Sequence, residues 1–112
     1  MGRFHTKIAG VTCKAPDGTD RQKIIREYCK EGMPLDLIPE PDNKHDSEAI
    51  GVWLAVKGFF SSKNYHLGYI SAEISNRLSG EILRGNEVDA HIKNVTGGGG
   101  NKSFGVNITT ET

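Results

Sequence analysis

The chain lacks an excess of charge of either sign. Its 112 residues include 14 Lys and Arg against 14 Asp and Glu, so the formal net charge is zero and the pI lies near 6.9. A protein that follows a nucleic-acid backbone through many phosphate contacts needs surplus cations, because each contact releases a counterion. The composition therefore argues against a general polyanion binder and leaves room for a small, local site.

Long apolar runs and cysteine motifs are also missing. The longest apolar stretch, 49–56, is much shorter than the ~20 residues that a transmembrane helix needs. The first five residues have no apolar run of the kind that a secretory signal requires, so we expect an intracellular, cytoplasmic protein. Cys13 and Cys29 stand sixteen positions apart without a C-x-x-C motif, which predicts neither a zinc knuckle nor a redox pair but two reduced, mostly buried thiols.

What remains is the composition of one small globular domain. Hydrophobic residues make up 36% of the chain and charged residues 25%, and the 14 glycines favour short strands joined by tight turns. A length of this order fits a single core. We therefore predict one domain over residues 1–112.

The hydrophobic periodicity predicts six strands and two helices. Alternation favours strands over 4–12, 33–38, 49–57, 65–70, 87–95 and 104–109, and spacing of three to four favours helices over 20–31 and 72–84. The order is βαβββαββ. Such a mainly β chain with two helices (α+β) most easily closes into a six-stranded, OB-like, partly open barrel.

The first helix has clear terminal signals. Thr19 and Gln22 have the T-x-x-Q spacing of a capping box, and Gly32 is placed to end the helix. Ile24, Ile25, Tyr28 and Cys29 form its apolar stripe, which places the cations on the outer surface: Arg21, Lys23, Arg26 and Lys30.

No catalytic motif emerges. The run Gly97 to Ser103 fails the P-loop pattern, because glycines are missing where Thr96 and Asn101 stand, and it is typical of a hairpin loop instead. The carboxylates Asp42, Asp46 and Glu48 lie in one loop rather than on several elements, which disfavours a two-metal nuclease centre. The histidines have no metal-ligand spacing and are interpreted as polar surface: His5, His45, His66 and His91. We predict no enzyme activity, no metal and no cofactor.

The zero net charge conceals a polarised chain. Residues 1–30 carry seven cations and three anions, whereas residues 31–50 carry six anions and only Lys44 as a cation. The acidic part is a loop stiffened by Pro39 and Pro41, beside the expected barrel mouth, where small barrels bind ligands.

Three segments together resemble the HIRAN domain pattern. Residues 40–46 match E-P-x-N-x-x-D, residues 49–52 match A-I-x-V, and residues 68–70 match G-Y-[IVL]. The first strand with Gly10-Val11 and the closing strand from Phe104 also fit. The resemblance covers nearly the whole chain.

This resemblance implies an OB-like barrel that binds single-stranded DNA and captures a free 3′ end. By position, Asp46 is the acceptor for the terminal hydroxyl, with Asp42 and Asn43 as polar neighbours. Tyr69 lines the groove and Phe104 contacts a base. An acceptor carboxylate suits an end, because a 3′ hydroxyl is a donor that an internal phosphodiester lacks.

Some positions depart from the family pattern. Lys7 and His45 stand where end-binding members have tyrosines, Thr6 replaces an arginine, and Ala72 replaces a lysine. Lys7 can still hold a phosphate and His45 can still stack on a base. The departures predict weaker binding or a different ligand.

The leading hypothesis is a DNA-binding module for single-stranded DNA or 3′ ends at stalled or damaged DNA, acting in DNA repair with a helicase or nuclease. The alternative is a protein–protein interaction domain that uses the barrel face or the basic first helix. A small metal-dependent nuclease ranks third. A purely structural role stays open for each site residue, since Asx side chains commonly shape turns and the aromatics could belong to the core.

Overall fold

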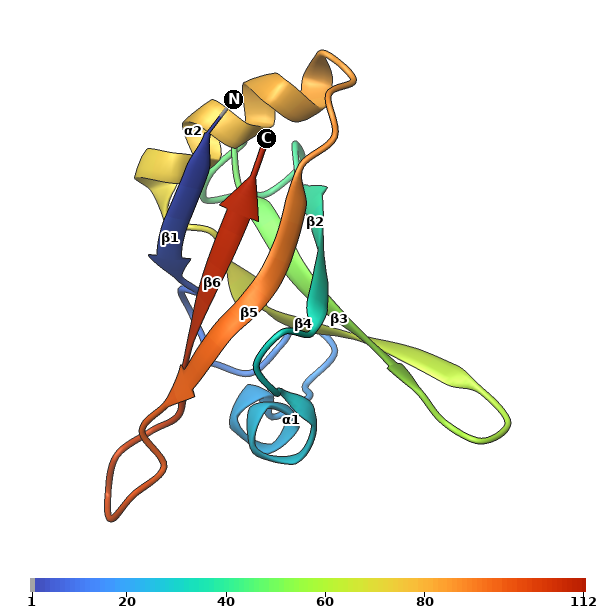
Figure 1. The fold of residues 1–112 in the computed structure, drawn as a ribbon, viewed down its shortest axis with the longest axis vertical. Helices are drawn as coiled ribbons and strands as arrows, with labels where there is room; N and C mark the ends of the chain where they lie inside the picture. Colours follow the sequence, from blue (N-terminus) through green and yellow to red (C-terminus); the bar gives the residue numbers. More distant parts are fainter. Residues whose placement is uncertain (1) are drawn as a thin grey trace.

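The computed structural model describes residues 2–112, which form six strands and two helices in the predicted order. Figure 1 shows the arrangement. The elements are β1 Arg3–Lys7, α1 Arg21–Tyr28, β2 Pro34–Pro39, β3 Ile50–Lys57, β4 Ser62–Tyr69, α2 Ala72–Leu83, β5 Asp89–Thr96 and β6 Gly105–Glu111.

All strand pairs are antiparallel, in the spatial order β1-β6-β5-β2-β3-β4. Strand β2 joins the two halves of the sheet, because Pro34 and Leu35 pair with β5 while its remaining residues pair with β3. Among residues 2–112, the two outer edges of the sheet meet at a single bridge, between Ala9 just after β1 and Tyr69 of β4. The sheet therefore curls without closing, which confirms the predicted OB-like, partly open barrel.

The core lies inside this curled sheet. Alternate residues of β6 point inward, so that Val106 and Ile108 are buried while Asn107 is only half-buried. The largest fully buried side chains come from both helices and four strands: Ile25, Ile50, Leu54, Leu67, Leu78, Ile92 and Ile108. Burying one such side chain contributes about 1.5 to 3 kcal/mol.

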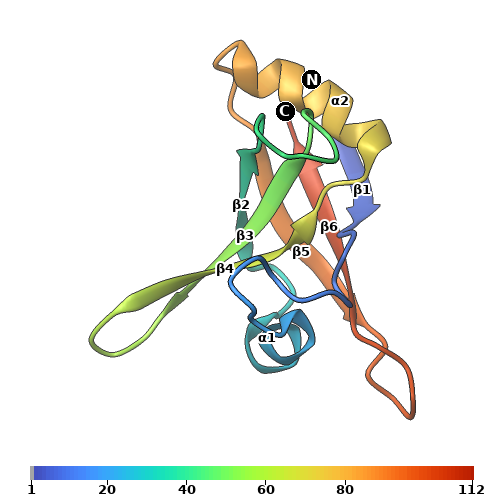
Figure 2. The ribbon, with the colours of Figure 1, turned by 180° about the vertical axis from the view of Figure 1, so that it is seen from behind.

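The two helices lie at opposite ends of the molecule. Figures 1 and 2 agree that α2 lies beside the 40–49 connection and the two chain ends, while α1 lies at the other end. The chain ends meet there, where the Gly2 amide donates to Thr112 Oγ1 at 2.9 Å.

The predicted capping of α1 is wrong by one residue. Asp20, not Thr19, is the N-cap, and its carboxylate accepts the Gln22 amide at 3.0 Å. Thr19 instead donates its amide to Asp17, and hydrogen bonds from the Thr19 side chain and from this amide hold the pKa of the Asp17 carboxyl below its usual value. The helix ends at Tyr28 rather than near Gly32, whose amide bonds to Ile92 in the following turn.

The placement of Arg21 on the outer surface is also wrong. Its side chain is buried, at 3% exposed, whereas Lys23, Arg26 and Lys30 are exposed as predicted. Arg21 precedes Ile24 and Ile25 by three and four residues, so it shares their face. Of the two thiols, Cys29 is buried as predicted, but Cys13 is exposed.

Two strand boundaries differ from the prediction by three residues or more. The first strand ends at Lys7, because Gly10 adopts a positive φ of 81° and turns the chain, with the Cys13 amide donating to the Gly10 carbonyl. Residues 62–64, predicted as loop, extend β4, because β3 and β4 pair as far as Lys57 with Ser62.

Candidate functional site

The polar 40–49 loop is shaped by its own side chains. Asn43 Oδ1 accepts the amides of His45 and Asp46, at 2.9 and 3.1 Å. Asp46 Oδ1 accepts the Glu48 amide at 2.9 Å, and the Glu40 amide donates to the Ala49 carbonyl across the loop base. The turn-shaping role that was left open for Asp46 is thus present, and Asn43 shapes the loop in the same way.

This loop forms one wall of a pocket of about 180 Å³ against the end of β4. The predicted residues Asn43, His45, Asp46 and Tyr69 line it together with Ala49 and Ile70. Among residues 2–112, the second carboxylate oxygen of Asp46 accepts no hydrogen bond. The pocket therefore presents a carboxylate acceptor, an imidazole and a phenol ring around an apolar floor.

Gly68 positions Tyr69 in this pocket. Its φ is +149°, and an added Cβ would collide with the Ala9 carbonyl. Only glycine lets the backbones approach closely enough for Ala9 and Tyr69 to exchange hydrogen bonds of 2.7 and 2.9 Å. The G-Y pair thus fastens the end of β4 to the segment after β1.

A buried hydrogen-bond chain supports the loop from behind. Arg21 donates through Nη2 to His66 Nδ1 at 2.8 Å, and His66 Nε2 lies 2.9 Å from Glu40 Oε2. Glu40 Oε1 in turn accepts from Asn43 Nδ2 at 3.3 Å. Because a guanidinium can only donate, His66 Nδ1 must accept, which puts the ring proton on Nε2, where it donates to Glu40. The chain connects α1 to the pocket loop.

The remaining donors of Arg21 are directed at backbone carbonyls. Nε donates to the His66 carbonyl and Nη1 to the Gly10 carbonyl, both at 3.0 Å. The guanidinium also lies over the Tyr69 ring, 5.8 Å from its centroid, and His66 meets the same ring edge-on at 4.8 Å. Arg21 and His66 therefore fix the ring that lines the pocket.

Gly51 leaves the space that the Glu40–His66 pair occupies. A Cβ at this position would collide with Glu40 Oε2 and lie 2.9 Å from His66 Nε2. The strand matched by A-I-x-V thus needs its glycine because the carboxylate and imidazole meet above it.

Lys7 lines a neighbouring hollow of about 320 Å³ on the outer face of β1, β5 and β6. It shares this hollow with Lys93, His5, Thr6 and Asn107, a set that has two lysines and no acid. Thr6 Oγ1 lies 3.4 Å from Ser71 Oγ. Ser71 follows Ile70, which lines the pocket, so Thr6 contacts the chain directly after the pocket.

The other two predicted residues lie apart from the pocket. Asp42 belongs to the same loop but is exposed and does not line the pocket. Phe104 is half-buried against the core, and its amide donates to Gln22 Oε1 of α1 at 2.7 Å. Phe104 is not among the residues that line the pocket, so the structure does not bring it to this site.

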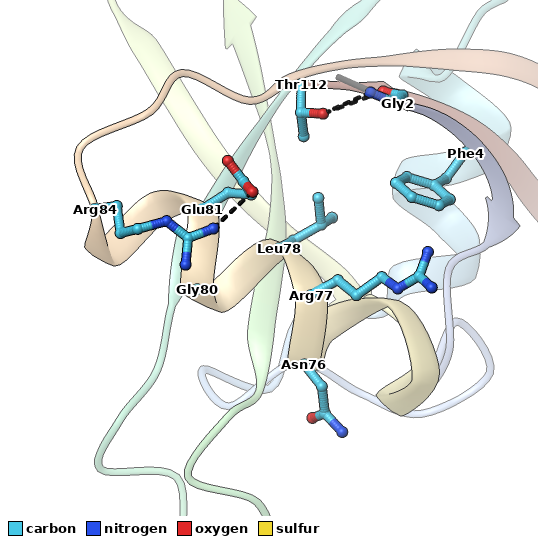
Figure 3. Close-up of a pocket in the computed structure, with 9 residues that line it drawn as sticks. All are labelled: Gly2, Phe4, Asn76, Arg77, Leu78, Gly80, Glu81, Arg84 and Thr112. Atoms are coloured by element: carbon cyan, nitrogen blue, oxygen red, sulfur yellow. Dashed lines mark hydrogen bonds and ion pairs between the residues drawn. The ribbon is translucent and has the colours of Figure 1, made fainter.

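A larger hollow, of about 390 Å³, lies between α2 and the chain ends (Figure 3). Its arginines are already engaged, since Arg77 stacks over Phe4 at 5.5 Å and Arg84 pairs with Glu81 at 2.7 Å. Hydrogen bonds from Asn86 and Arg84 hold the pKa of the Glu81 carboxyl below its usual value. None of the predicted site residues lines this hollow.

Sequence reasoning missed the residues behind the pocket. His66 was interpreted as polar surface, but it is 7% exposed, between Trp53 and Tyr69. The available signal was the position of Arg21 in the apolar stripe of its helix, which marks a buried cation that needs partners.

Residues 2–112 contain neither a cluster of metal-binding side chains nor a helix that could span a membrane. No three His, Cys, Asp or Glu side chains in this range gather in a way that could hold a metal ion. Neither helix of the range is long and apolar enough to cross a membrane.

One family model and two crystal structures are similar to this chain. The family model for the HIRAN domain matches residues 1–110. The crystal structure of the HIRAN domain of human HLTF is similar, with a TM-score of 0.63 and 14% identity over 97% of this chain and 73% of that one. A crystal structure of a protein from Lactobacillus plantarum has a TM-score of 0.60 and 16% identity over 99% of this chain and 100% of that one. No curated protein matches the sequence.

Proposed function

The chain belongs to the HIRAN domain family, a family of nucleic-acid-binding rather than catalytic domains, and from that premise we propose that it captures single-stranded 3′ ends of DNA. The observation that supports this function best is the pocket in which Asn43, His45, Asp46 and Tyr69 converge. Asp46 accepts the terminal hydroxyl through its unengaged oxygen. His45 and Tyr69 contact the last base, since base stacking on aromatic rings tolerates any sequence.

The basic hollow suits the phosphates that precede the captured end. Lys7 and Lys93 provide two cations beside the pocket without a competing acid among its lining residues. A single strand whose end sits at Asp46 passes across Ser71 and Thr6 toward these lysines. In this proposal the module has no catalysis of its own and works with a helicase or nuclease at stalled or damaged DNA.

Fluorescence anisotropy with a 3′-hydroxyl oligonucleotide and its 3′-phosphate twin tests end capture. We expect the wild type to favour the hydroxyl end by about tenfold, because a carboxylate accepts from a hydroxyl and repels a phosphate. Asp46→Asn should abolish this preference while keeping the turn, since an amide oxygen can still accept the Glu48 amide.

Asp36→Asn is the matched control, because Asp36 is an exposed carboxylate on β2 outside the pocket. Equal affinity of the wild type for the two oligonucleotides would refute end capture. The protein-interaction alternative predicts instead that Asp46→Asn leaves activity in cells intact, while charge reversal at Lys23 and Arg26, the exposed cations of α1, removes it.

A further inference from the structure

The turn between β3 and β4 exposes two phenylalanines. Phe59 and Phe60 are each 96% exposed, and their rings contact each other edge-on at 5.0 Å. The turn is tight, since the Gly58 amide donates to the Ser61 carbonyl at 2.6 Å. Central turn positions usually hold glycine, proline or small polar residues. Two large, exposed apolar rings at these positions therefore indicate a surface that binds a ligand.

The two rings stand at the end of a projecting ribbon. Strand β3 pairs with β2 only as far as Trp53, and from Leu54 to Lys57 its one partner strand in the described chain is β4. Figures 1 and 2 show this ribbon extending away from the body of the molecule. Its tip is therefore accessible to a large ligand from several sides.

The ribbon is basic. Residues 49–72 contain Lys57 and Lys63 and no acid. Neither lysine forms an ion pair within residues 2–112, although the charge of Lys63 contributes to the lowered pKa of Asp17. Lys63 lies over the Tyr65 ring at 5.2 Å, and Tyr65 stacks on Tyr28 of α1 at 5.8 Å. Lys63 therefore lies between the two exposed rings of the tip and the stacked Tyr65 and Tyr28 rings nearer the body.

We propose that this ribbon is a second contact for single-stranded nucleic acid, with Phe59 and Phe60 stacking on bases and Lys57 and Lys63 on phosphates. Single-strand binders combine these two features, cations along the backbone and aromatic platforms for the bases. An apolar protein partner explains the rings but not the lysines without acids, and so the charge favours a polyanion with flat π faces.

This inference rests on the proposed function and extends it along the strand. Ala49, which lines the pocket, comes directly before β3, and the tip follows Lys57, seven residue steps after Ile50. At about 3.3 Å per residue these sites are ~23 Å apart. Only a long oligonucleotide reaches both sites. Comparing oligonucleotides of different length therefore distinguishes binding at the ribbon from binding at the pocket.

The test compares 3′-hydroxyl oligonucleotides of about 4 and about 16 nucleotides, the limits for one OB fold. We expect Phe59→Ser with Phe60→Ser to weaken the longer one by tenfold or more and leave the shorter one unchanged. Phe59→Tyr with Phe60→Tyr should keep the affinity, because the rings still stack. The corresponding leucine pair should lose it. Leu83→Ser, which removes an exposed apolar side chain from the end of α2, is the control.

Each outcome decides the proposal. Unchanged affinity of the serine pair for the longer strand would overturn it, and so would full binding by the leucine pair, which would show apolar docking rather than stacking. A dimer that the serine pair abolishes would identify a second copy of the chain as the occupant instead. Asp46→Asn can leave the affinity for both oligonucleotides unchanged while the double serine variant binds the longer one more weakly. In that case end capture is refuted and the ribbon contact is supported.

Discussion

Arg21 shows how a single buried cation can organise a site that it does not line. It reaches His66 from α1, and His66 passes the constraint to Glu40 and Asn43 of the pocket loop. Its positive charge has no direct carboxylate partner in residues 2–112, and Glu40 compensates it across the neutral imidazole. Loss of any one of these four side chains is therefore expected to weaken the other hydrogen bonds of the network.

Arg21→Lys should therefore destabilise the protein strongly. A lysine cannot donate to His66 Nδ1, the His66 carbonyl and the Gly10 carbonyl from one fixed fork, so buried acceptors lose their partners. We expect the free energy of unfolding in urea to fall by about 3 kcal/mol. Arg26→Lys, at an exposed position of the same helix, should change it by less than about 0.5 kcal/mol. Equal effects of the two substitutions would contradict the buried role of Arg21.

The two cysteines should differ in reactivity and in their effect on stability. Burial raises the pKa of the Cys29 thiol from 9.0 to about 11, whereas Cys13 is exposed. A raised thiol pKa favours the folded state below pH 9, and this contribution is lost as the pH rises from 9 toward 11. Iodoacetamide at neutral pH should label Cys13 alone in the folded protein. Unfolding curves of Cys29→Ala should show a smaller loss of stability over that pH range.

Individual residues were predictable where a local pattern carried the information. Asn43, His45, Asp46 and Tyr69 were named from short motifs and line one pocket, whereas Lys7, Asp42 and Phe104, named in the same way, do not line it. The burial of Arg21 and His66 was not predictable, because it depends on a contact between α1 and β4, and the two residues are 45 positions apart in sequence. Hydrophobic periodicity records which face is buried, but not that a cation on that face has found acceptors.

Among the elements, the strands and helices followed from periodicity, while their ends depended on particular contacts. The end of β1 is set by the turn at Gly10, and the extent of β4 by pairing with β3 as far as Lys57. The start of α1 is set by which of two adjacent polar residues turns its side chain to the helix. The T-x-x-Q pattern named Thr19, but Gln22 uses its side chain on the Val11 and Phe104 carbonyls instead.

Substitutions at the start of α1 test this assignment. Asp20→Ala removes the acceptor for the Gln22 amide and should cost about 1 kcal/mol of unfolding free energy. Thr19→Ala, which leaves that acceptor in place, should cost clearly less. Thermal or urea unfolding of the two variants shows which residue caps the helix. A larger loss of stability for Thr19→Ala would support the capping box with Thr19 as the N-cap.

For the whole molecule, zero net charge and nucleic-acid binding are compatible because two parts of the surface carry lysines without a neighbouring acid in the same segment or hollow. The acidic loop lines the candidate pocket, and lysines lie in the hollow beside Lys7 and on the projecting ribbon. A continuous phosphate track is absent from this distribution in residues 2–112. Under the proposed function, this distribution favours a few defined phosphate contacts.

The salt dependence of binding should count those contacts. For single strands, the slope of log K against log salt concentration is about −0.7 for each neutralised phosphate. A short oligonucleotide that meets only Lys7 and Lys93 should therefore give a slope of about −1.4, and a long one that also meets Lys57 and Lys63 about −2.8. Removing the ribbon lysines with Lys57→Gln and Lys63→Gln should return the slope for the long strand to the value for the short one. A slope that is steep and independent of length would instead indicate general attraction to the backbone, for which a chain without surplus cations has no source.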